Sequence, residues 1–489
     1  MDYALVRFAL LRVLALVYLA AFLIAAFQIV PLVGAHGLEP VEPFLDRARG
    51  DGGAFDAFVR LPTLFWLGAS DRALLVVSWL GAGLSFAALA GVENALVQLA
   101  LWVLYLSIAQ IGQTFYSFGW EYQLLETGML AVFLCPARTL RPLAGSPPYV
   151  VILLLRWLIV RVMLGAGLIK LRGDPCWRDL TCLVYHYETQ PNPSPLSWLF
   201  HAMPPWAHRG GALGNFAVEL VAPFFAFGPR RARLVAGALF VAFQLTLIAS
   251  GNLSFLNWLT IVPALACFDD RALRALVPRR FVTKLASHHA EPSRPHVIAA
   301  ITYAVVVILL SLEPTVNLVS PNQVMNRSYD RLHLVGTYGA FGSVGRERKE
   351  IILEGTSDAV VDERTVWLPY ELPCKPGDPA RRPCLVTPYH YRLAWQIWFA
   401  AMSSPGRQPW LVHFVAKLLE GDPGAKSLLA KDPFPDSPPR FVRATLWRYE
   451  MTRPGEPLWW RRTYVRPYLP PMSRDDPDLA AFLRTYGWW

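Results

Sequence analysis

Charged residues are scarce in this 489-residue chain. They make up 17% of it, while hydrophobic residues make up 54%, and a soluble globular chain carries about 25% charged residues. Cysteine is also scarce: six residues are far below the density of a secreted disulfide scaffold. The composition therefore excludes a simple soluble enzyme, a disordered chain and a small disulfide-rich protein.

Motifs of soluble enzymes and metal sites are absent as well. The sequence contains no HExxH, no Walker A and no GxSxG motif. It also lacks CxxC and the Cys/His spacings that are typical of zinc sites. Gly339, Gly342 and Gly345 form a loose series that follows no strand–helix unit, so it predicts a loop. We expect no metal ion and no cofactor.

The balance of charge is positive. The net charge is +10, and arginine outnumbers lysine 39 to 7. A basic chain can bind nucleic acid, but here the excess falls in short loops between long apolar runs. This placement favours the lipid bilayer as the partner and predicts no nucleic acid. The bias toward Arg, Ala and Pro is typical of a chain from a GC-rich bacterium.

Long apolar runs before residue 313 predict about nine membrane spans, since a helix needs about 20 residues to cross the hydrocarbon core. The first run is longer than the apolar part of a signal peptide, and no clean cleavage site follows it, so we expect it to stay. The fourth and sixth are short and also fit tilted or re-entrant segments. The runs are Phe8–Pro31, Arg72–Ala90, Ala95–Gly112, Tyr122–Pro136, Tyr149–Leu171, Leu213–Gly228, Leu234–Ser250, Leu253–Phe268 and Val297–Leu312.

The arginines predict the orientation, because cytoplasmic loops are enriched in Lys and Arg. The loops after the third and seventh spans carry no Lys or Arg. The pattern predicts an inside N-terminus and an outside C-terminus, with the segments 34–71 and 172–212 outside. The basic residues that carry this prediction follow the fourth, sixth and eighth spans: Arg138, Arg141, Arg230, Arg231, Arg233, Arg271, Arg274, Arg279, Arg280, Lys284 and Arg294.

The chain changes character after Glu313, and residues 325–489 contain no run long enough to span a membrane. Two segments rich in β-branched and aromatic residues and a third that alternates in part predict strands, and two more segments have helical spacing. This order predicts a small α+β domain with enough residues to bury its own core. The strands are expected at Arg348–Leu353, Thr365–Leu372 and Arg440–Thr452, and the helices at Tyr391–Met402 and Trp410–Leu419.

The predicted fold is therefore a polytopic α-helical membrane protein followed by a small α+β extramembrane domain. The transmembrane domain covers residues 1–312, and the outer domain covers residues 313–489. Two cysteine pairs fall on the outer side, where an oxidising compartment would let each pair form a disulfide. The alternative for each pair is two free thiols. The pairs are Cys374 with Cys384 and Cys176 with Cys182.

The densest polar segment is 170–190, at the outer end of the fifth span. Charged side chains at a membrane edge are costly unless paired or solvated, which makes them functional candidates. An interfacial aromatic belt with snorkelling basic residues is the alternative. The candidates are Lys170, Asp174, Trp177, Arg178, Asp179, Tyr185, His186, Tyr187, Glu188 and Gln190.

Four ionisable residues lie inside predicted spans: Glu126, Arg156, Arg161 and Glu219. We expect Arg156 to pair with Glu126, and Arg161 to pair with Glu219. These pairs either tie helices together or line a polar cavity for a substrate or an ion.

Several long strings carry a family resemblance. Over nearly its whole length the chain resembles the lipase maturation factor family. The resemblance implies a multi-span membrane protein with a lumenal C-terminal domain, which in eukaryotes sits in the endoplasmic reticulum membrane and assists folding and dimer assembly of secreted lipases. In a bacterium the matching place is the inner membrane, with the C-terminal domain in the periplasm. The strings are LPTLFWLGASD at 61–71, GWEYQLLETG at 119–128, GDPCWRDLTCLVYHYETQPNPSPLSW at 173–198, and the stretches 377–402 and 431–452.

A shorter stretch, AGLIKL followed by DPCW, resembles a helix of vitamin K-dependent carboxylases and their horizontally transferred transmembrane (HTTM) relatives. This resemblance implies Lys170 as a catalytic base, since a lysine withdrawn from water can accept a proton. The main hypothesis is a membrane chaperone or maturation factor that binds secreted client proteins, such as lipases, through its outer domain and the aromatic, Pro-rich loop Tyr185–Trp206. The alternative is a membrane enzyme that uses Lys170 with His186 or Glu188. A transporter is disfavoured, because no inverted repeat is evident.

Overall fold

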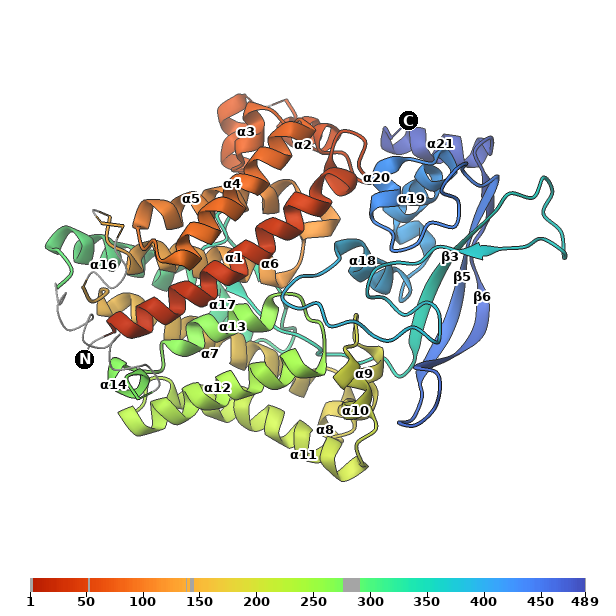
Figure 1. Cartoon of the computed structure of the whole chain (residues 1–489). Helices are drawn as coiled ribbons and strands as arrows, with labels where there is room; N and C mark the ends of the chain where they lie inside the picture. Colours follow the sequence, from red (N-terminus) through yellow and green to blue (C-terminus); the bar gives the residue numbers. More distant parts are fainter. Residues whose placement is uncertain (1–2, 52, 138, 141–144, 276–290, 489) are drawn as a thin grey trace.

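The computed structural model of the chain describes residues 3–51, 53–137, 139–140, 145–275 and 291–488. Helices form a bundle, and a sheet with its covering helices lies at one end of that bundle (Figure 1). Part of the evidence for the predicted orientation lies outside the described residues, namely Arg138, Arg141, Arg279, Arg280 and Lys284.

Within the described residues, five helices are long and apolar enough to cross a membrane by length and composition. The chain is therefore a polytopic helical membrane protein. All five coincide with predicted spans. They are α1 (Ala4–Val33), α4 (Asp71–Ala90), α7 (Tyr149–Arg172), α12 (Arg230–Ser250) and the pair formed by α16 (Arg294–Leu310) and α17 (Leu312–Val319).

The remaining predicted spans are helical but shorter, so the total of nine stays a prediction. The sixth, Leu213–Gly228, is broken, because α11 (Pro205–Phe216) ends inside it and a π turn at Ala217–Val221 follows. A 3-10 turn comes next, and its Pro223 has no N–H with which to continue an α-helix. The third, fourth and eighth predicted spans correspond to α5 (Ala95–Ile111), α6 (Gly119–Leu134) and α13 (Leu256–Leu265).

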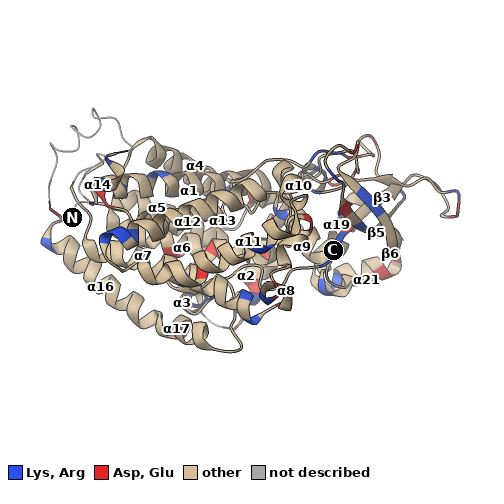
Figure 2. Cartoon of the chain, turned by 90° about the horizontal axis from the view of Figure 1, so that it is seen from below, with Lys and Arg blue, Asp and Glu red and all other residues tan. Residues whose placement is uncertain are grey.

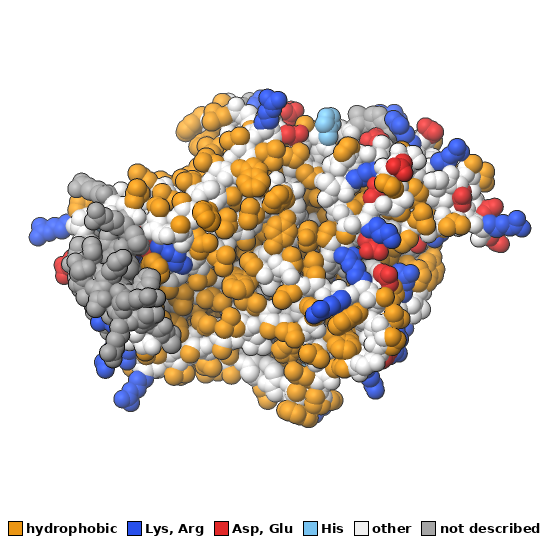
Figure 3. Space-filling view, viewed as in Figure 1, with side chains coloured by type: hydrophobic (Ala, Val, Ile, Leu, Met, Phe, Trp, Pro, Cys, Tyr) orange, Lys and Arg blue, Asp and Glu red, His pale blue; other side chains and the backbone are white. Residues whose placement is uncertain are grey.

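Among the five long helices, α1 and α7 are the most deeply buried in the bundle. In the most apolar stretch of 18 residues of each helix, 67% of the residues are buried in α1 and 72% in α7. The corresponding share is only 28% in α12 and 28% in the α16–α17 pair. A helix that is apolar all round lies either in a protein core or in lipid. The exposed apolar side chains of α4, α12 and α16 therefore form the surface that lipid covers, and Figure 3 shows hydrophobic side chains over much of the bundle.

Charged side chains gather toward the sheet end of the molecule, whereas most of the bundle carries few (Figure 2). The short helices α8 (Pro175–Arg178), α9 (Cys182–Thr189) and α10 (Pro195–His201) lie at this end of the bundle, next to the sheet (Figure 1). Two more, α2 (Val41–Arg49) and α3 (Ala54–Arg60), connect α1 to α4 in the chain and lie on the flank of the bundle (Figure 1). At the opposite end, α14 (Asp270–Leu273) lies near the N-terminus.

The C-terminal part contains a four-stranded antiparallel sheet in the order β4-β3-β5-β6. Ile351 of β3 lies opposite Leu446 of β5, and both are buried beneath the helices of this part. A separate pair, β1 (Arg327–Ser328) and β2 (Gly336–Thr337), precedes the sheet. The remaining elements are β3 (Arg348–Thr356), β4 (Leu368–Pro369), β5 (Phe441–Met451), β6 (Trp460–Ser473), α18 (Arg392–Ala400), α19 (Pro409–Glu420), α20 (Pro423–Ser427) and α21 (Pro477–Tyr486).

Both predicted helices of this part, and the predicted strands that begin at Arg348 and Arg440, are confirmed. The strand expected at Thr365–Leu372 is reduced to the two residues of β4. The 14-residue strand β6 was missed. Its sequence does not alternate, since most residues between Arg461 and Pro467 are exposed on both faces and prolines interrupt it.

Candidate functional site

The polar segment 170–190 contains the end of α7, a turn, and the two short helices α8 and α9. The Asp174 carboxylate accepts a hydrogen bond from the Cys176 N–H (2.9 Å), and Pro175 takes the first helical position, an arrangement that starts a helix. The predicted glycine loop is indeed a loop, and it covers this turn. The N–H of Asp174 donates to Gly342 O (2.8 Å). A Cβ on Gly173 would clash with the same carbonyl, which requires glycine there.

A small apolar core lies below the turn. The disulfide Cys176–Cys182 joins α8 to α9, with a Cα–Cα distance of 4.8 Å. Trp177 is buried beside it and donates from Nε1 to Phe341 O (2.8 Å). The structure thus forms the disulfide, one of the two alternatives that the sequence left open for this pair, and Trp177 packs as a core side chain.

Lys170 is buried in the last turn of α7. Its Nζ lies 2.5 Å from Glu219 Oε1 and 3.1 Å from Asn215 Oδ1, and it faces the Trp177 ring at 5.1 Å. The π turn Ala217–Val221 carries Glu219, and π turns occur frequently at functional sites. A buried ion pair therefore accounts for Lys170.

The predicted pairing of the intramembrane charges was wrong. Arg161, not Arg156, pairs with Glu126, and both side chains are buried. Glu126 also accepts from the Gly336 N–H (3.1 Å) and from Tyr338 Oη (2.6 Å). Glu126 and Arg161 thus hold the chain that leaves the bundle near β2.

Arg156 and Glu219, the other two predicted partners, are engaged elsewhere. Arg156 donates to Ala266 O (2.8 Å) and to Tyr3 Oη (2.8 Å), and Glu219 pairs with Lys170. Arg156 and Arg161 are five residues apart, hence about 140° apart around their helix. Only the packed bundle decides which of the two faces an acidic partner.

The remaining candidates divide between the bundle and the sheet. Burial, and then the Lys170 charge, lower the pKa of His186 to about 4, so this imidazole is neutral near pH 7. Glu188 lies 3.2 Å from His201 and accepts from the Met451 N–H (3.0 Å). Glu188 therefore faces β5 and does not join Lys170, which leaves His186 as the other partner that the enzyme hypothesis named.

Gln190 and the two tyrosines make contacts that hold the short helices after α7 in place. Gln190 Nε2 donates to Ser250 O (2.8 Å), which ties the segment to the end of α12. Tyr187 packs against Phe200, with ring centroids 5.3 Å apart. Arg346 lies over the Tyr185 ring (4.6 Å) and pairs with Asp174 (3.2 Å). Of the predicted site residues, Arg178 and Asp179 remain exposed.

Sequence reasoning missed the residues that join the segment to the sheet. Arg348, at the start of β3, is buried and donates to three carbonyl oxygens, those of Glu188 (2.8 Å), Gln190 (2.5 Å) and Pro191 (2.9 Å). Arg348 also pairs with the buried Glu350 at 2.5 Å, and Lys375 contacts the same carboxylate. The sequence offered one signal for this role, because Arg348 places a charge at a core-facing position of a predicted strand.

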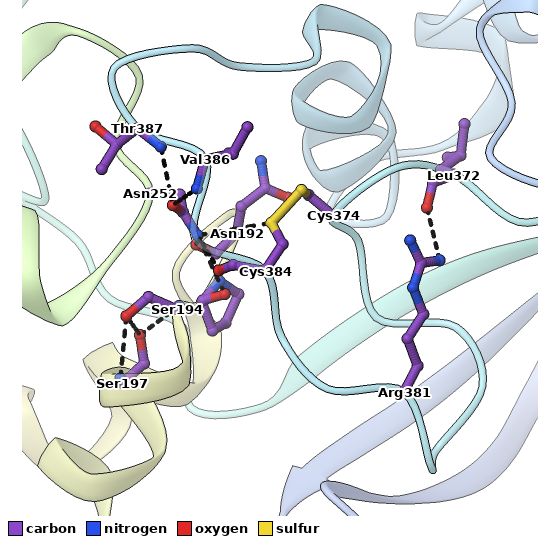
Figure 4. The surroundings of a disulfide bond; sticks show 11 residues. Asn192, Ser194, Ser197, Asn252, Leu372, Cys374, Arg381, Cys384, Val386 and Thr387 are labelled. Carbon is purple, nitrogen blue, oxygen red and sulfur yellow. Dashed lines mark hydrogen bonds between the residues drawn. A yellow bond between two sulfur atoms is a disulfide. The ribbon is translucent and has the colours of Figure 1, made fainter.

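The second disulfide lies at this junction (Figure 4). Cys374 and Cys384 are paired, as predicted, with a Cα–Cα distance of 5.2 Å. The fully buried Asn252, which follows α12, donates to Cys384 O (2.9 Å) and accepts from the N–H groups of Val386 (2.9 Å) and Thr387 (3.2 Å). A single side chain of the bundle therefore holds the end of the disulfide loop.

An apolar surface remains exposed next to these contacts. Trp198 of α10 packs against Trp459 (centroids 4.9 Å apart) and donates to Thr452 Oγ1 (3.3 Å). This fixes α10 against the C-terminal part. The side chains beyond it face outward: Leu196 is 44% exposed, Leu199 48%, Met203 41% and Trp206 75%. We call Leu196, Leu199, Met203 and Trp206 the outer apolar surface.

Lys170→Arg tests whether this lysine acts as a base. Arginine keeps the charge that Glu219 requires, whereas its proton is too tightly held for it to serve as a base near neutrality. We expect client maturation per folded molecule to survive, measured as client activity divided by protein abundance. Arg172→Lys, in the same last turn of α7, is the matched control. Complete loss of function at unchanged abundance would revive the enzyme hypothesis.

Two family models match the chain. The lipase maturation factor transmembrane domain matches residues 5–275, and the lipase maturation factor C-terminal domain matches residues 334–470. Together these ranges include the buried pairs of the bundle, the segment 170–190 and most of the sheet. No solved structure matches the chain.

Curated relatives are similar over almost the whole length. The chain is 48% identical to lipase maturation factor 1 of Bos taurus, covering 99% of this chain and 91% of that protein. It is 45% identical to lipase maturation factor 1 of Homo sapiens, covering 99% and 90%. Lipase maturation factor 2 of Homo sapiens is 30% identical, covering 94% and 81%.

Proposed function

The chain belongs to the lipase maturation factor family, and on this premise we propose that it is a membrane-embedded maturation factor that assists folding or assembly of secreted lipases. The observation that carries the proposal is identity of 45–48% over 99% of the chain to proteins named lipase maturation factor 1. Similarity on this scale extends through both the bundle and the C-terminal part.

The alternative of a membrane enzyme has no comparable support. The curated relatives are named as maturation factors, and the local resemblance to carboxylases covers only the end of α7. Lys170 is engaged by Glu219 and Asn215, and Glu188 faces away from it. We therefore assign this cluster a structural role at the junction.

We propose that the client binds at the outer apolar surface. Large exposed apolar patches on soluble surfaces mark interaction sites, and Trp is enriched among the residues that contribute most to binding. Met203 and Trp206 flank the pair Pro204–Pro205, which limits the conformations of the loop. A rigid, exposed apolar surface suits a partly folded protein.

The proposal also includes a location. We place residues 313–489 and the segments 34–71 and 172–212 on the outer side, which is the lumen in eukaryotic relatives and the periplasm if the chain functions in a bacterial inner membrane. The loop arginines support this orientation. The two disulfides support it as well, since disulfides persist in oxidising compartments. Residues 1–312 form the transmembrane domain in this division.

The double variant Met203→Ser, Trp206→Ala tests the client surface. In cells that lack their own maturation factor, we expect secreted lipase activity to fall about tenfold, because loss of one buried aromatic contact commonly costs that much in affinity. The abundance of the factor itself should not change, since both side chains are exposed.

The matched control is Trp79→Ala on α4, where an exposed Trp (49%) faces the lipid side of the bundle. It should leave lipase secretion unchanged. Equal loss in both variants, or no loss in the double variant, would remove the outer apolar surface from the proposal.

A further inference from the structure

A second apolar surface lies on the flank of the bundle, on α3 and the turn that follows it. Phe55 is 77% exposed, Phe58 48% and Val59 44%, and Leu67 in the next turn is 91% exposed. In α3 only Ala57 is buried. Figure 3 shows hydrophobic side chains over this corner of the molecule, continuing onto the bundle. We call Phe55, Phe58, Val59 and Leu67 the flank surface.

The flank surface is held in place by its backbone. Arg60 donates from Nη2 to Arg49 O (2.7 Å), and Arg331 donates to Val59 O (2.9 Å). The turn that ends at Leu67 is attached to α5, because the Leu64 N–H donates to Ser107 Oγ (3.0 Å). Carbonyl groups at the ends of α2 and α3 thus have fixed donors, while the large apolar side chains stay largely exposed among the residues that the structure describes.

The flank surface is continuous with the part of the bundle that faces lipid. Leu67 lies four residues before α4, and on α4 the apolar side chains of Val76 (63%) and Leu80 (51%) are exposed along the span. Phe27 of α1 packs against Trp79 of α4 at 5.5 Å and is itself 61% exposed. Short amphipathic helices with aromatic residues commonly lie in the plane of the membrane interface, with the apolar side in the acyl region.

The charge of the surrounding segment helps to identify what covers the flank surface. Residues 34–71 contain three arginines, and six acidic residues at positions 39, 42, 46, 51, 56 and 71. Anionic lipid headgroups are attracted by clusters of basic residues, and this segment has an excess of acidic ones. Electrostatic attraction to anionic headgroups therefore does not explain the flank surface. The apolar side chains then provide the attraction, through the acyl chains.

We propose that α3 lies flat in the outer leaflet, with the flank surface in contact with lipid acyl chains. This assignment is separate from the client surface, which lies on α10 and α11. The consequence concerns the C-terminal part. The same outer segment contacts α19, where His413 Nδ1 lies 2.8 Å from Leu38 O. Embedding α3 therefore sets the height of the C-terminal part above the membrane.

Spin labels at single introduced cysteines can test this. The described free cysteines, Cys135 and Cys267, are buried and the other four are paired, so a label at Phe55→Cys or Phe58→Cys reports one site. The full chain is placed in phosphatidylcholine nanodiscs without client. Power saturation then measures exposure to oxygen, which enters the bilayer, and to a water-soluble nickel chelate.

The controls are Leu80→Cys on the lipid face of α4 and Val360→Cys, 71% exposed in the long connection from β3 to β4. We expect the oxygen-to-nickel ratio at Phe55 and Phe58 to match that of Leu80, and to exceed that of Val360 by about tenfold, because the acyl region excludes the chelate.

Three results would overturn the proposal. A ratio equal to that of Val360 would place α3 in water. Low exposure to both reagents would mean that protein, such as a second copy of the chain, covers the flank surface. A high ratio that requires added phosphatidylglycerol would make the headgroup the partner instead of the acyl chains.

Discussion

Replacing Arg392 by alanine should lower the free energy of unfolding by about 3–5 kcal/mol, the usual cost of leaving one partner of a buried ion pair uncompensated. Arg392, the first residue of α18, and Glu121 of α6 are both fully buried, with Nη1 2.7 Å from Oε1. The guanidinium also donates to Phe115 O (2.7 Å) and lies 3.4 Å from the centre of the Tyr116 ring. These contacts anchor the C-terminal part in the bundle.

Thermal unfolding of the purified protein in detergent measures this loss. The double variant Arg392→Met, Glu121→Met should lose less stability than Arg392→Ala, because it leaves no unpaired charge in the interior. Arg461→Ala removes an exposed arginine from β6 and should leave the transition unchanged. A double variant that is as unstable as Arg392→Ala would show that the pair does not act as a unit.

Replacing Cys374 and Cys384 by serine should lower the free energy of unfolding by about 3 kcal/mol, because a disulfide reduces the conformational entropy of the unfolded chain. The bond closes a loop with a sequence separation of 10 residues. Its end is also the part that Asn252 holds through Cys384 O and the Val386 N–H. We therefore expect the C-terminal part to detach from α12 at a lower temperature than in the parent protein.

Mass spectrometry of unreduced peptides should show one species that links the two cysteines. Alkylation supplies an internal control, because Cys135 and Cys267 are free but buried and should react only after denaturation. If Cys374 and Cys384 are both alkylated in the native protein, the bond does not exist. If the serine variant unfolds like the parent, the bond contributes nothing to stability.

The local sequence pattern predicted helices and strands best where a single physical requirement, such as the thickness of the bilayer, sets their length and composition. The length and composition of α1, α4, α7, α12 and the α16–α17 pair follow from the thickness of the bilayer, so their apolar runs were sufficient to identify them. The strands at Arg348 and Phe441 alternate or carry β-branched residues, and they were predicted near their observed bounds. Strand β6 was not, since its partner β5 stabilises it despite its prolines.

Pairing and burial of charges were decided by the packed structure. Arg156, Arg161 and Lys170 all lie on α7, and a sequence does not specify how far a helix is rotated or shifted against its neighbours. In the observed packing of α7, Arg161 pairs with Glu126 and Lys170 pairs with Glu219.

The same reasoning applies to the junction between the bundle and the C-terminal part. Local sequence did not indicate a special role for Asn252 or Arg392, and for Arg348 it offered only a charge at a core-facing strand position. Each of the three is buried by a segment more than 100 residues away. Apolar composition therefore determined that the chain enters a membrane, and it located the five long helices that can cross it. Long-range packing decided which polar side chains hold the bundle and the C-terminal part together. Burial removes water from these side chains, so each of them requires a specific partner.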